Sequence, residues 1–404
     1  MKKYILIILC CLTSFPLWSY NVNMIVEHYS VDQGLPNNTV NCTLKDRDGF
    51  IWFGTWYGLC CFDGVKFKTF NKQEHDSDVP PRKIQRIVED KNGYIWVKTI
   101  DRKLYVFNKV TECFHAVYDD MKNYSENIQV IKLQNTAEGD VLLLTKDKNL
   151  LLAGVDEKGQ VTIKILFDSR DEINKHDYTL KHHVLCETEE YISWIGTDYK
   201  VSAVHKGAEL ASRPADFITS KINSGDKDSF TSFFEDGRKV WVGDRAGIFY
   251  SIDVRTGLVN RYVLSEIKGA ISNLLVTPAG YVYLSVAGQG TYEYDLAERR
   301  LQKINTEMND AMVTHAFIDQ YDKIWFHENE KALIYYDPLN HTAKRFPFTM
   351  FGKITTLYSE DAGERGLFFL SPAGEAWLFD REHAEMVYIN KLKQLSNDRA
   401  NQQF

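Results

Sequence analysis

The chain has 404 residues, of which 44% are hydrophobic and 25% are charged, and its formal net charge is −7 at pH 7. This length allows two or three domains or one large repeat architecture, and the apolar content excludes a globally disordered chain. The negative net charge gives no electrostatic support to a nucleic-acid-binding role. Aromatic residues reach 13% and there are only 9 prolines, which favours strands joined by tight turns.

The first 20 residues have the pattern of a targeting segment. Two lysines precede an apolar run over residues 4–12, and Pro16 and Ser19 follow it. A basic start, an apolar stretch and a polar exit are typical of a secretory signal peptide. The run is shorter than the ~20 apolar residues that a membrane span requires. We therefore expect residues 1–20 to be a cleaved signal peptide and the mature chain to make no membrane contact.

An odd number of cysteines remains after the predicted signal peptide. Their spacing contains no CxxC pair and no Cys/His ligand array, so the sequence predicts neither a disulfide framework nor a metal site. We interpret these residues as free thiols buried in strands. They are Cys42, Cys60, Cys61, Cys113 and Cys186.

A short apolar and aromatic motif returns eight times along the chain, and its successive copies are 42 to 52 residues apart. A repeat at such a period indicates a repeat architecture. The clear copies are IWFGT at 51–55, IWVKT at 95–99, SWIGT at 193–197, VWVGD at 240–244 and IWFHE at 324–328. The weaker copies are VLLLT at 141–145, VYLSV at 282–286 and LFFLS at 367–371.

Each motif lies in the same local pattern. An acidic, glycine-containing turn precedes it, as at residues 46–49 and 90–93, and an alternating strand follows it, as at residues 59–63 and 104–108. In such turns Asp accepts hydrogen bonds from backbone N–H groups and Gly supplies the positive φ. A fourth strand follows, as at residues 66–70. Four short strands in about 45 residues is the period of a β-propeller blade, with the motif tryptophan packed between blades.

We therefore predict an all-β chain, a β-propeller of four-stranded antiparallel blades over residues 21–350. A strand at residues 24–31 is expected to supply the outer strand of the last blade and to close the ring at seven blades. Residues 351–390 then form an eighth repeat, either a surplus blade or the start of a second propeller, and residues 391–404 form a polar tail. A ring of eight blades is the alternative.

One stretch of the first repeat resembles a known family. The segment YSVDQGLPNNTV at residues 29–40 leads into DRDGFIWFGT at residues 46–55 and FDG at residues 62–64. This pattern resembles the two-component regulator propeller repeat, and looser copies cover most of the mature chain. The resemblance implies the periplasmic sensor region of a hybrid two-component system of gut Bacteroidetes. Such a region detects a polysaccharide fragment and controls a carbohydrate-utilisation locus.

In that family, two propellers and an immunoglobulin-like domain precede a membrane helix, a histidine kinase, a receiver and a DNA-binding domain. The sequence contains no counterpart of these later parts. We therefore expect the chain to bind an oligosaccharide and to form a homodimer. The signalling domains of the receptor are expected to be encoded elsewhere. The alternative is a propeller scaffold for protein–protein interaction.

The turns between the second and third strands of each repeat are the predicted ligand-binding region. In an up-and-down blade they open on the same face as the connections between blades. They combine rings that can stack on sugars with charged groups that can bind hydroxyls, although ordinary solvated turns carry similar residues. The candidate residues are Trp56, Tyr57, Asp101, Arg102, Asp198, Tyr199, Asp244, Arg245, Gln289 and Glu328.

Catalysis is the remaining alternative, because exported propellers include polysaccharide-degrading enzymes. Glycoside hydrolysis needs two convergent carboxylates, and the candidate acids here fall at repeat-equivalent turns, as scaffold repetition alone would produce. His182 and His183 are adjacent, so in a strand they point to opposite faces and do not easily share a metal. We expect no catalytic residue, no metal and no cofactor.

Overall fold

The computed structural model describes residues 29–70, 80–121, 129–146, 149–167, 180–188, 190–196, 201–207, 215–216, 230–304, 313–328, 331–351, 358–361, 366–371 and 375–391. In these ranges helix is limited to α2 (Tyr118–Met121) and to 3₁₀ turns at Val31–Gln33 and Phe348–Phe351. No helix of the described ranges is long and apolar enough to cross a membrane. The described residues fall into two compact units, one within His28–Ile318 and one within Asp319–Phe404.

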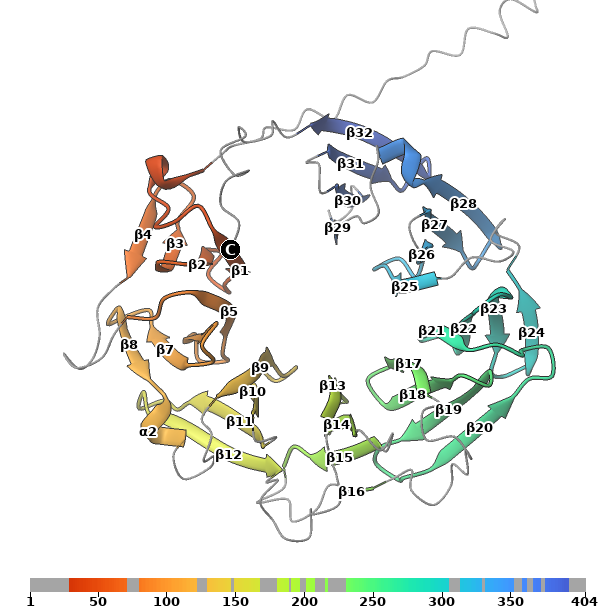
Figure 1. Ribbon diagram of the computed structural model, residues 1–404, viewed down its shortest axis with the longest axis horizontal. Helices are drawn as coiled ribbons and strands as arrows, with labels where there is room; N and C mark the ends of the chain where they lie inside the picture. The colour runs from red at the N-terminus through yellow and green to blue at the C-terminus, as the bar shows by residue number, and fades with distance from the viewer. Residues whose placement is uncertain are drawn as a thin grey trace, which may run out of the picture. The chain divides into compact units, whose positions relative to one another are not determined.

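The strands of the described residues form eight four-stranded antiparallel sheets, each built from four consecutive strands (Figure 1). The first sheet contains β1 (Val40–Lys45), β2 (Ile51–Thr55), β3 (Gly58–Phe62) and β4 (Phe67–Phe70), and the second contains β5 (Ile84–Glu89), β6 (Ile95–Thr99), β7 (Leu104–Asn108) and β8 (Cys113–Ala116). The third contains β9 (Val130–Asn135), β10 (Val141–Thr145), β11 (Leu150–Val155) and β12 (Val161–Phe167), and the fourth contains β13 (Leu180–Glu187), β14 (Tyr191–Gly196), β15 (Val201–His205) and β16 (Ala215–Asp216).

The other four sheets follow the same order along the chain. The fifth contains β17 (Phe230–Glu235), β18 (Lys239–Asp244), β19 (Ile248–Asp253) and β20 (Val259–Val263), and the sixth contains β21 (Ile271–Val276), β22 (Tyr281–Val286), β23 (Gly290–Asp295) and β24 (Arg300–Lys303). The seventh contains β25 (Val313–Ile318), β26 (Ile324–Glu328), β27 (Ala332–Asp337) and β28 (Thr342–Pro347), and the eighth contains β29 (Tyr358–Asp361), β30 (Gly366–Leu370), β31 (Glu375–Asp380) and β32 (Glu385–Lys391). The predicted all-β class and four-stranded repeats are confirmed.

The start of the described chain differs from the prediction. Residues 24–28 lie outside the described residues, and Val31–Gln33 forms a 3₁₀ turn where a strand was expected. Ser30 caps this turn, because its hydroxyl accepts from the Asp32 N–H at 3.2 Å while its own N–H donates to the Gln33 side chain at 2.8 Å. Gly34, at φ 111°, ends it. The predicted strand is therefore wrong at residues 29–31, and β28 supplies the fourth strand of the seventh sheet, the place this strand was expected to take.

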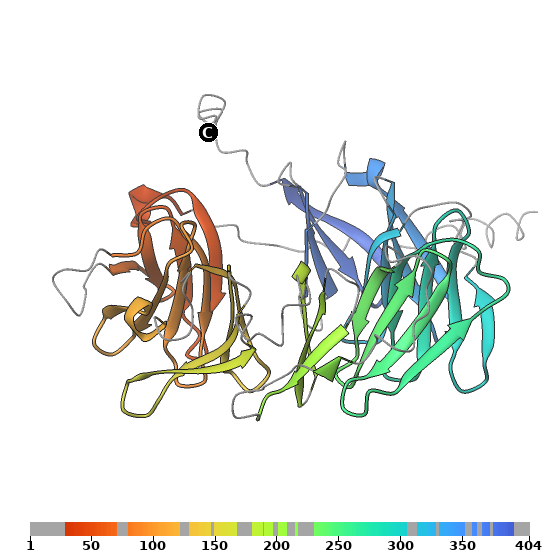
Figure 2. The same cartoon turned by 60° about the horizontal axis from the view of Figure 1, so that its bottom comes forward.

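Large apolar side chains of the second strands fill the space between neighbouring sheets. Trp52 stacks on Phe70 at 5.4 Å between ring centroids and contacts Phe107 of the second sheet at 5.6 Å. Trp96 and Trp325 are fully buried. The sheets β17–β20 and β21–β24 lie side by side in both views (Figure 2), with the first strands β17 and β21 in contact. Tryptophan therefore packs between sheets, as the repeat predicted.

Four of the turns between first and second strands share one hydrogen-bonding device. In each, one carboxylate oxygen of an Asp accepts from two backbone N–H groups of its own turn, and the other oxygen accepts from the motif indole N–H. Asp46 accepts from Phe50 N at 2.8 Å and from Trp52 Nε1 at 2.8 Å. The indole distances in the other three pairs are 2.9 Å for Asp90–Trp96, 2.7 Å for Asp236–Trp241 and 3.4 Å for Asp319–Trp325. We call residues 46–50, 90–94, 236–239 and 319–323 the braced turns.

Candidate functional site

An ion-pair network links the braced turns of the first two sheets. Carboxylate oxygens of Asp46, Asp48 and Glu89 lie within 4.8 Å of one another, the spacing of a metal-ligand group. The ammonium of Lys109 lies among them, at 2.9, 3.0 and 2.7 Å from the three carboxylates. This cation offsets part of the negative charge, Arg47 lies 3.3 Å from Glu89, and Lys109 connects the β7–β8 turn to the first sheet, so the arrangement is an internal ion-pair network.

The charge states in this network are strongly fixed. Burial disfavours the charged form of Lys109, but its hydrogen bonds to the three carboxylates outweigh burial and raise its pKa. Burial likewise acts to raise the pKa of Asp46, while hydrogen bonds from Trp52 and Lys109 outweigh it and lower that pKa. Both groups therefore stay ionised at neutral pH and hold each other in place.

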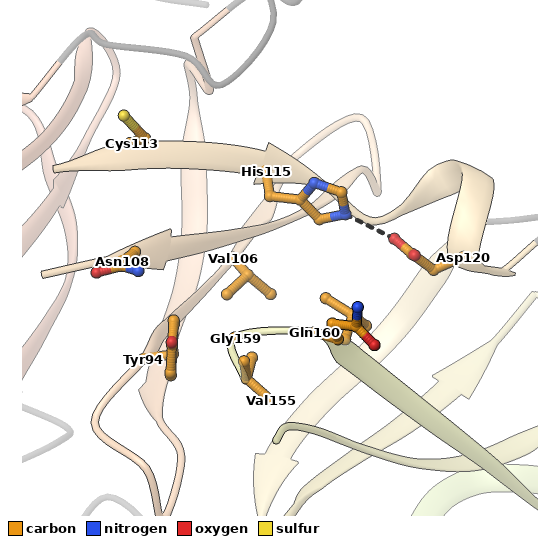
Figure 3. A pocket seen from close by; sticks show the side chains of 10 residues that line it. Tyr94, Val106, Asn108, Cys113, His115, Asp120, Val155, Gly159 and Gln160 are labelled. Carbon is orange, nitrogen blue, oxygen red and sulfur yellow. Dashed lines mark hydrogen bonds and ion pairs between the residues drawn. The ribbon is translucent and has the colours of Figure 1, made fainter. Parts of the chain in front are cut away.

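The same end of the sheets carries a pocket of about 360 Å³ between the second and third sheets (Figure 3). The His115 ring, from β8, faces Asp120 of α2, and His115 Nε2 lies 2.7 Å from Asp120 Oδ2. Tyr94 and Gln160 are among the other lining residues. The volume lies in the range of small-molecule sites, and the lining combines a ring with amide and ionisable groups. None of the predicted ligand-binding residues lines this pocket.

The sequence did not point to this pocket because its parts come from different repeats. His115 and Asp120 flank the end of β8 and the start of α2, whereas Gln160 lies on the β11–β12 turn. The helix α2, which follows β8 in place of a tight connection, is a departure from the repeat at this pocket.

Two predicted residues present aromatic rings at the β2–β3 turn. The relative exposures of Trp56 and Tyr57 are 41% and 60%. The ammonium of Lys83 lies 5.2 Å from the centroid of the Trp56 ring, within the range of a cation–π contact. Both rings are therefore accessible, and one of them has a neighbouring cation.

Backbone hydrogen bonds align this turn with the equivalent turn of the second sheet. Lys83 N donates to Trp56 O at 2.9 Å, and Ile100 N donates to Lys83 O at 2.9 Å. Lys83 thereby joins the backbone of Trp56 to that of Ile100, the residue that precedes Asp101 and Arg102. We call residues 55–58 and 99–103 the open turns.

Asp101 and Arg102 have different partners. The Asp101 carboxylate accepts from Thr99 Oγ1 at 2.5 Å and lies 3.6 Å from Lys103 Nζ. Arg102 has a φ of 66°, and its Nη1 donates to the amide oxygen of Gln129 at 3.2 Å. The guanidinium thus has a neutral partner, while the carboxylate is already paired.

Two of the remaining predicted residues, Asp244 and Glu328, are buried and already have partners within the protein. Asp244 is 2% exposed and accepts from Ala246 N at 2.9 Å and Ile248 N at 2.8 Å, so its carboxylate caps its own turn. Glu328, 4% exposed, pairs with Arg345 at 3.0 Å.

Gln289 bridges to a neighbouring loop and Arg245 is exposed. The Gln289 amide accepts from Lys268 N at 2.7 Å and donates to Glu266 O at 3.1 Å. Arg245 is the next residue after Asp244, in the turn that the Asp244 carboxylate caps. Asp198 and Tyr199 lie outside the described residues.

Lys98 belongs to the same region and was not singled out from the sequence. It is 5% exposed, and its ammonium donates to the side-chain amide of Gln85. The available signal was a comparison of motifs, because IWVKT carries a lysine where IWFGT, SWIGT and VWVGD carry glycine.

The structure describes the side chains of Cys42, Cys60, Cys61 and Cys113, and all four are free and lie in strands. Cys60 and Cys113 are buried as predicted, whereas Cys42 and Cys61 are half-buried. Burial raises the pKa of Cys60 to about 12 and that of Cys42 to about 11. These thiols are therefore protonated and poor nucleophiles at neutral pH. The side chain of Cys186 lies outside the described part of the chain.

Comparison with known proteins identifies one repeat and the fold. Residues 34–57 match the family model of the two-component regulator propeller. A search of curated proteins gave no match to the sequence. The chain is similar to the Dos1 propeller, with 13% identity, coverage of 82% of this chain and 90% of that one, and a TM-score of 0.51. At this identity the likeness shows the fold alone, a β-propeller.

Two further similar structures are extracellular domains assigned to hybrid two-component systems of B. thetaiotaomicron. For BT4673 the identity is 13%, the coverage is 90% of this chain and 62% of that chain, and the TM-score is 0.40. For BT3049 the identity is 15%, the coverage is 92% and 55%, and the TM-score is 0.37. The chain thus spans less than two thirds of the length of these domains.

Proposed function

We propose that this chain is the ligand-sensing propeller region of a hybrid two-component regulator, exported to the periplasm, where it binds an oligosaccharide without cleaving it. One observation carries the proposal: the segment that matches the two-component regulator propeller ends at Trp56 and Tyr57, the exposed ring pair of the open turns. Its partners are the oligosaccharide, a second copy of the chain, and receptor domains that carry the output.

The chemistry of the open turns supports sugar binding. Indole and phenol rings stack on the apolar faces of sugar rings, and guanidinium groups donate paired hydrogen bonds to oxygen atoms. The backbone bonds through Lys83 fix the two open turns to each other before any ligand arrives, which reduces the entropy cost of binding.

The state of the acidic residues supports binding over hydrolysis. A glycosidase needs one carboxyl group to give up a proton and another to act on the sugar or on water. Asp244 caps its turn, Glu328 is paired with Arg345, and Asp101 is held by Thr99 and Lys103. Each candidate acid thus has a structural partner that competes with such a role.

A calorimetric titration of the exported chain against a panel of plant and host oligosaccharides, with product analysis of each mixture, tests the proposal. We expect binding by at least one saccharide with no new products. Product formation would replace the proposal with an enzymatic function, and absence of binding by a folded chain across the panel would contradict it.

Two variants locate the binding. Trp56→Ala should weaken the affinity, whereas Phe50→Ala is the matched control, because Phe50 is also 41% exposed but lies on a braced turn at the other end of β2. Equal losses in the two variants would contradict a site at the open turns.

A further inference from the structure

One position of the second strand distinguishes the second sheet from its neighbours. A Cβ added at Gly54 would lie 2.5 Å from Cys42 Sγ and 2.6 Å from Ile84 Cγ2. A Cβ at Gly243 would lie 2.4 Å from Ser232 Oγ and 2.8 Å from a side-chain carbon of Ile271 in the next sheet. This position therefore faces the first strands of two successive sheets, where space is short. The second sheet places Lys98 there.

The Lys98 ammonium is buried, and no carboxylate of the described residues forms an ion pair with it. The ammonium donates a hydrogen bond to the neutral side-chain amide of Gln85, and the residue opposite Lys98 in the strand pairing is Arg86, another cation. Burial, and then the charge of Arg102, lower the pKa of Lys98. Burying a cation beside a second one costs stability unless an anion offsets it.

No carboxylate among the described residues forms an ion pair with Lys98 or Arg102. Asp101 is the nearest acid along the chain, but its carboxylate is held by Thr99 and Lys103. Arg102 donates to Gln129, again a neutral amide. The chain has 55 acidic and 48 basic residues, so the lack of a counter-ion here does not follow from a shortage of acids.

The two amides cover the cations without neutralising them. Gln85 is exposed, so its side chain can move aside without loss of core packing. An anion in its place would accept charge-assisted hydrogen bonds, which are about twice as strong as those to a neutral acceptor. Backbone hydrogen bonds through Lys83 join the turn that carries Trp56 and Tyr57 to Ile100, two residues before Arg102.

We propose that Lys98 and Arg102 bind the carboxylate or sulfate group of an acidic oligosaccharide whose sugar rings contact Trp56 and Tyr57. This inference rests on the proposed function and specifies its ligand class. Lys98 and Arg102 supply the counter-charge, and the rings of the open turns supply contact area.

The test compares matched acidic and neutral ligands by calorimetry. The probes are trigalacturonic acid and its methyl ester, a sulfated galactan tetrasaccharide and its desulfated form, and inorganic sulfate. The acid or the sulfate ester should bind at least tenfold more tightly than its neutral counterpart, since a hydrogen bond to a charged group is worth about that factor or more. The pair that shows the preference identifies the anion.

Lys98→Met should reduce this preference to less than about threefold while leaving the affinity for the neutral counterpart unchanged. Arg102→Met, which changes a residue in a turn, should also reduce the preference for the acidic ligand. It provides the test if the Lys98 variant does not fold. Lys45→Met is the control, because this lysine is exposed and lies at the end of β1 beside a braced turn. It should keep the preference.

The outcomes separate the two proposals. Equal affinities for acidic and neutral ligands would overturn the acidic-ligand inference while leaving saccharide sensing intact. Binding of inorganic sulfate together with no saccharide would overturn both, because the site would then hold an adventitious ion only. A preference that survives in Lys98→Met and Arg102→Met would also overturn the inference.

Discussion

The braced turns and the open turns of the first two sheets carry charged side chains in opposite states of pairing. At the braced turns, Lys109 contacts three carboxylates and Asp46 is bonded by an indole, an ammonium and its own turn. Beside and within the open turns, Lys98 of β6 and Arg102 contact neutral amides, while Lys103 pairs with Asp101. The difference indicates where charge stabilises the fold and where it is left for a ligand.

The largest effect is expected from Asp46→Ala. This change leaves Lys109 with fewer buried partners and removes the acceptor of Trp52 Nε1 and of two backbone N–H groups. The free energy of unfolding should fall by about 3–5 kcal/mol, measured by denaturant titration. Asp48→Ala, at the exposed rim of the same group, is the control and should cost less than about 1 kcal/mol. Equal losses would contradict the structural role of the braced turns.

The same substitution at the two ends should have opposite effects on stability. Lys109→Met leaves three carboxylates facing one another and should lower the free energy of unfolding by about 2–3 kcal/mol. Lys98→Met removes a buried cation without a counter-ion and should raise it by about 1 kcal/mol. Thermal and denaturant unfolding of both variants measure this. A loss of stability in both would mean that Lys98 is as well compensated as Lys109.

A smaller effect is expected on binding when one ring is removed. Trp56→Ala should weaken the affinity for a bound saccharide about tenfold, the loss typical of an exposed aromatic anchor, with little change in stability. Calorimetry with the best-binding saccharide measures it beside Phe50→Ala. An unchanged affinity in Trp56→Ala would move the site away from the open turns.

The smallest effect concerns acid stability. The pKa of Asp46 is lowered in the folded state, so its contribution to stability is present above the ordinary Asp pKa of about 4 and is lost as the pH falls through the lowered value. The free energy of unfolding of the native chain should therefore decline below about pH 4. Asp46→Asn should be less stable at pH 7 and should show a shallower decline. An identical decline in both proteins would contradict the lowered pKa.

The repeat explains how much of the fold could be predicted from the sequence. Strand periodicity, Asp-Gly turns and the motif tryptophan are local signals, so the four-stranded sheets and the buried Trp96 followed from them. The strand expected at residues 24–31 is absent at residues 29–31, because Ser30 and Gln33 cap a 3₁₀ turn there. The apolar residues of this segment suggested a strand, although Ser30 and Gln33 are spaced as the capping residues of a helical turn.

The candidate site was harder to predict, because it depends on pairing across strands. Turn position selected Trp56 and Arg102, but it also selected Asp244, which caps its own turn, and Glu328, which Arg345 neutralises. Lys98 lies within a strand motif, and only the register against β5 shows that an amide and a cation, with no acid, face it. Sequence position identifies a turn, but it does not reveal whether a charge there already has a partner.

Hydrogen exchange measured by mass spectrometry, with and without the saccharide that binds best, tests the central claim most directly. A ligand at the open turns should slow exchange of the backbone N–H groups at residues 55–58, 83 and 99–103. Exchange at the braced turns, residues 46–50 and 90–94, should stay unchanged. Protection confined to the braced turns, or no protection in a chain that binds saccharide, would contradict a ligand site at the open turns.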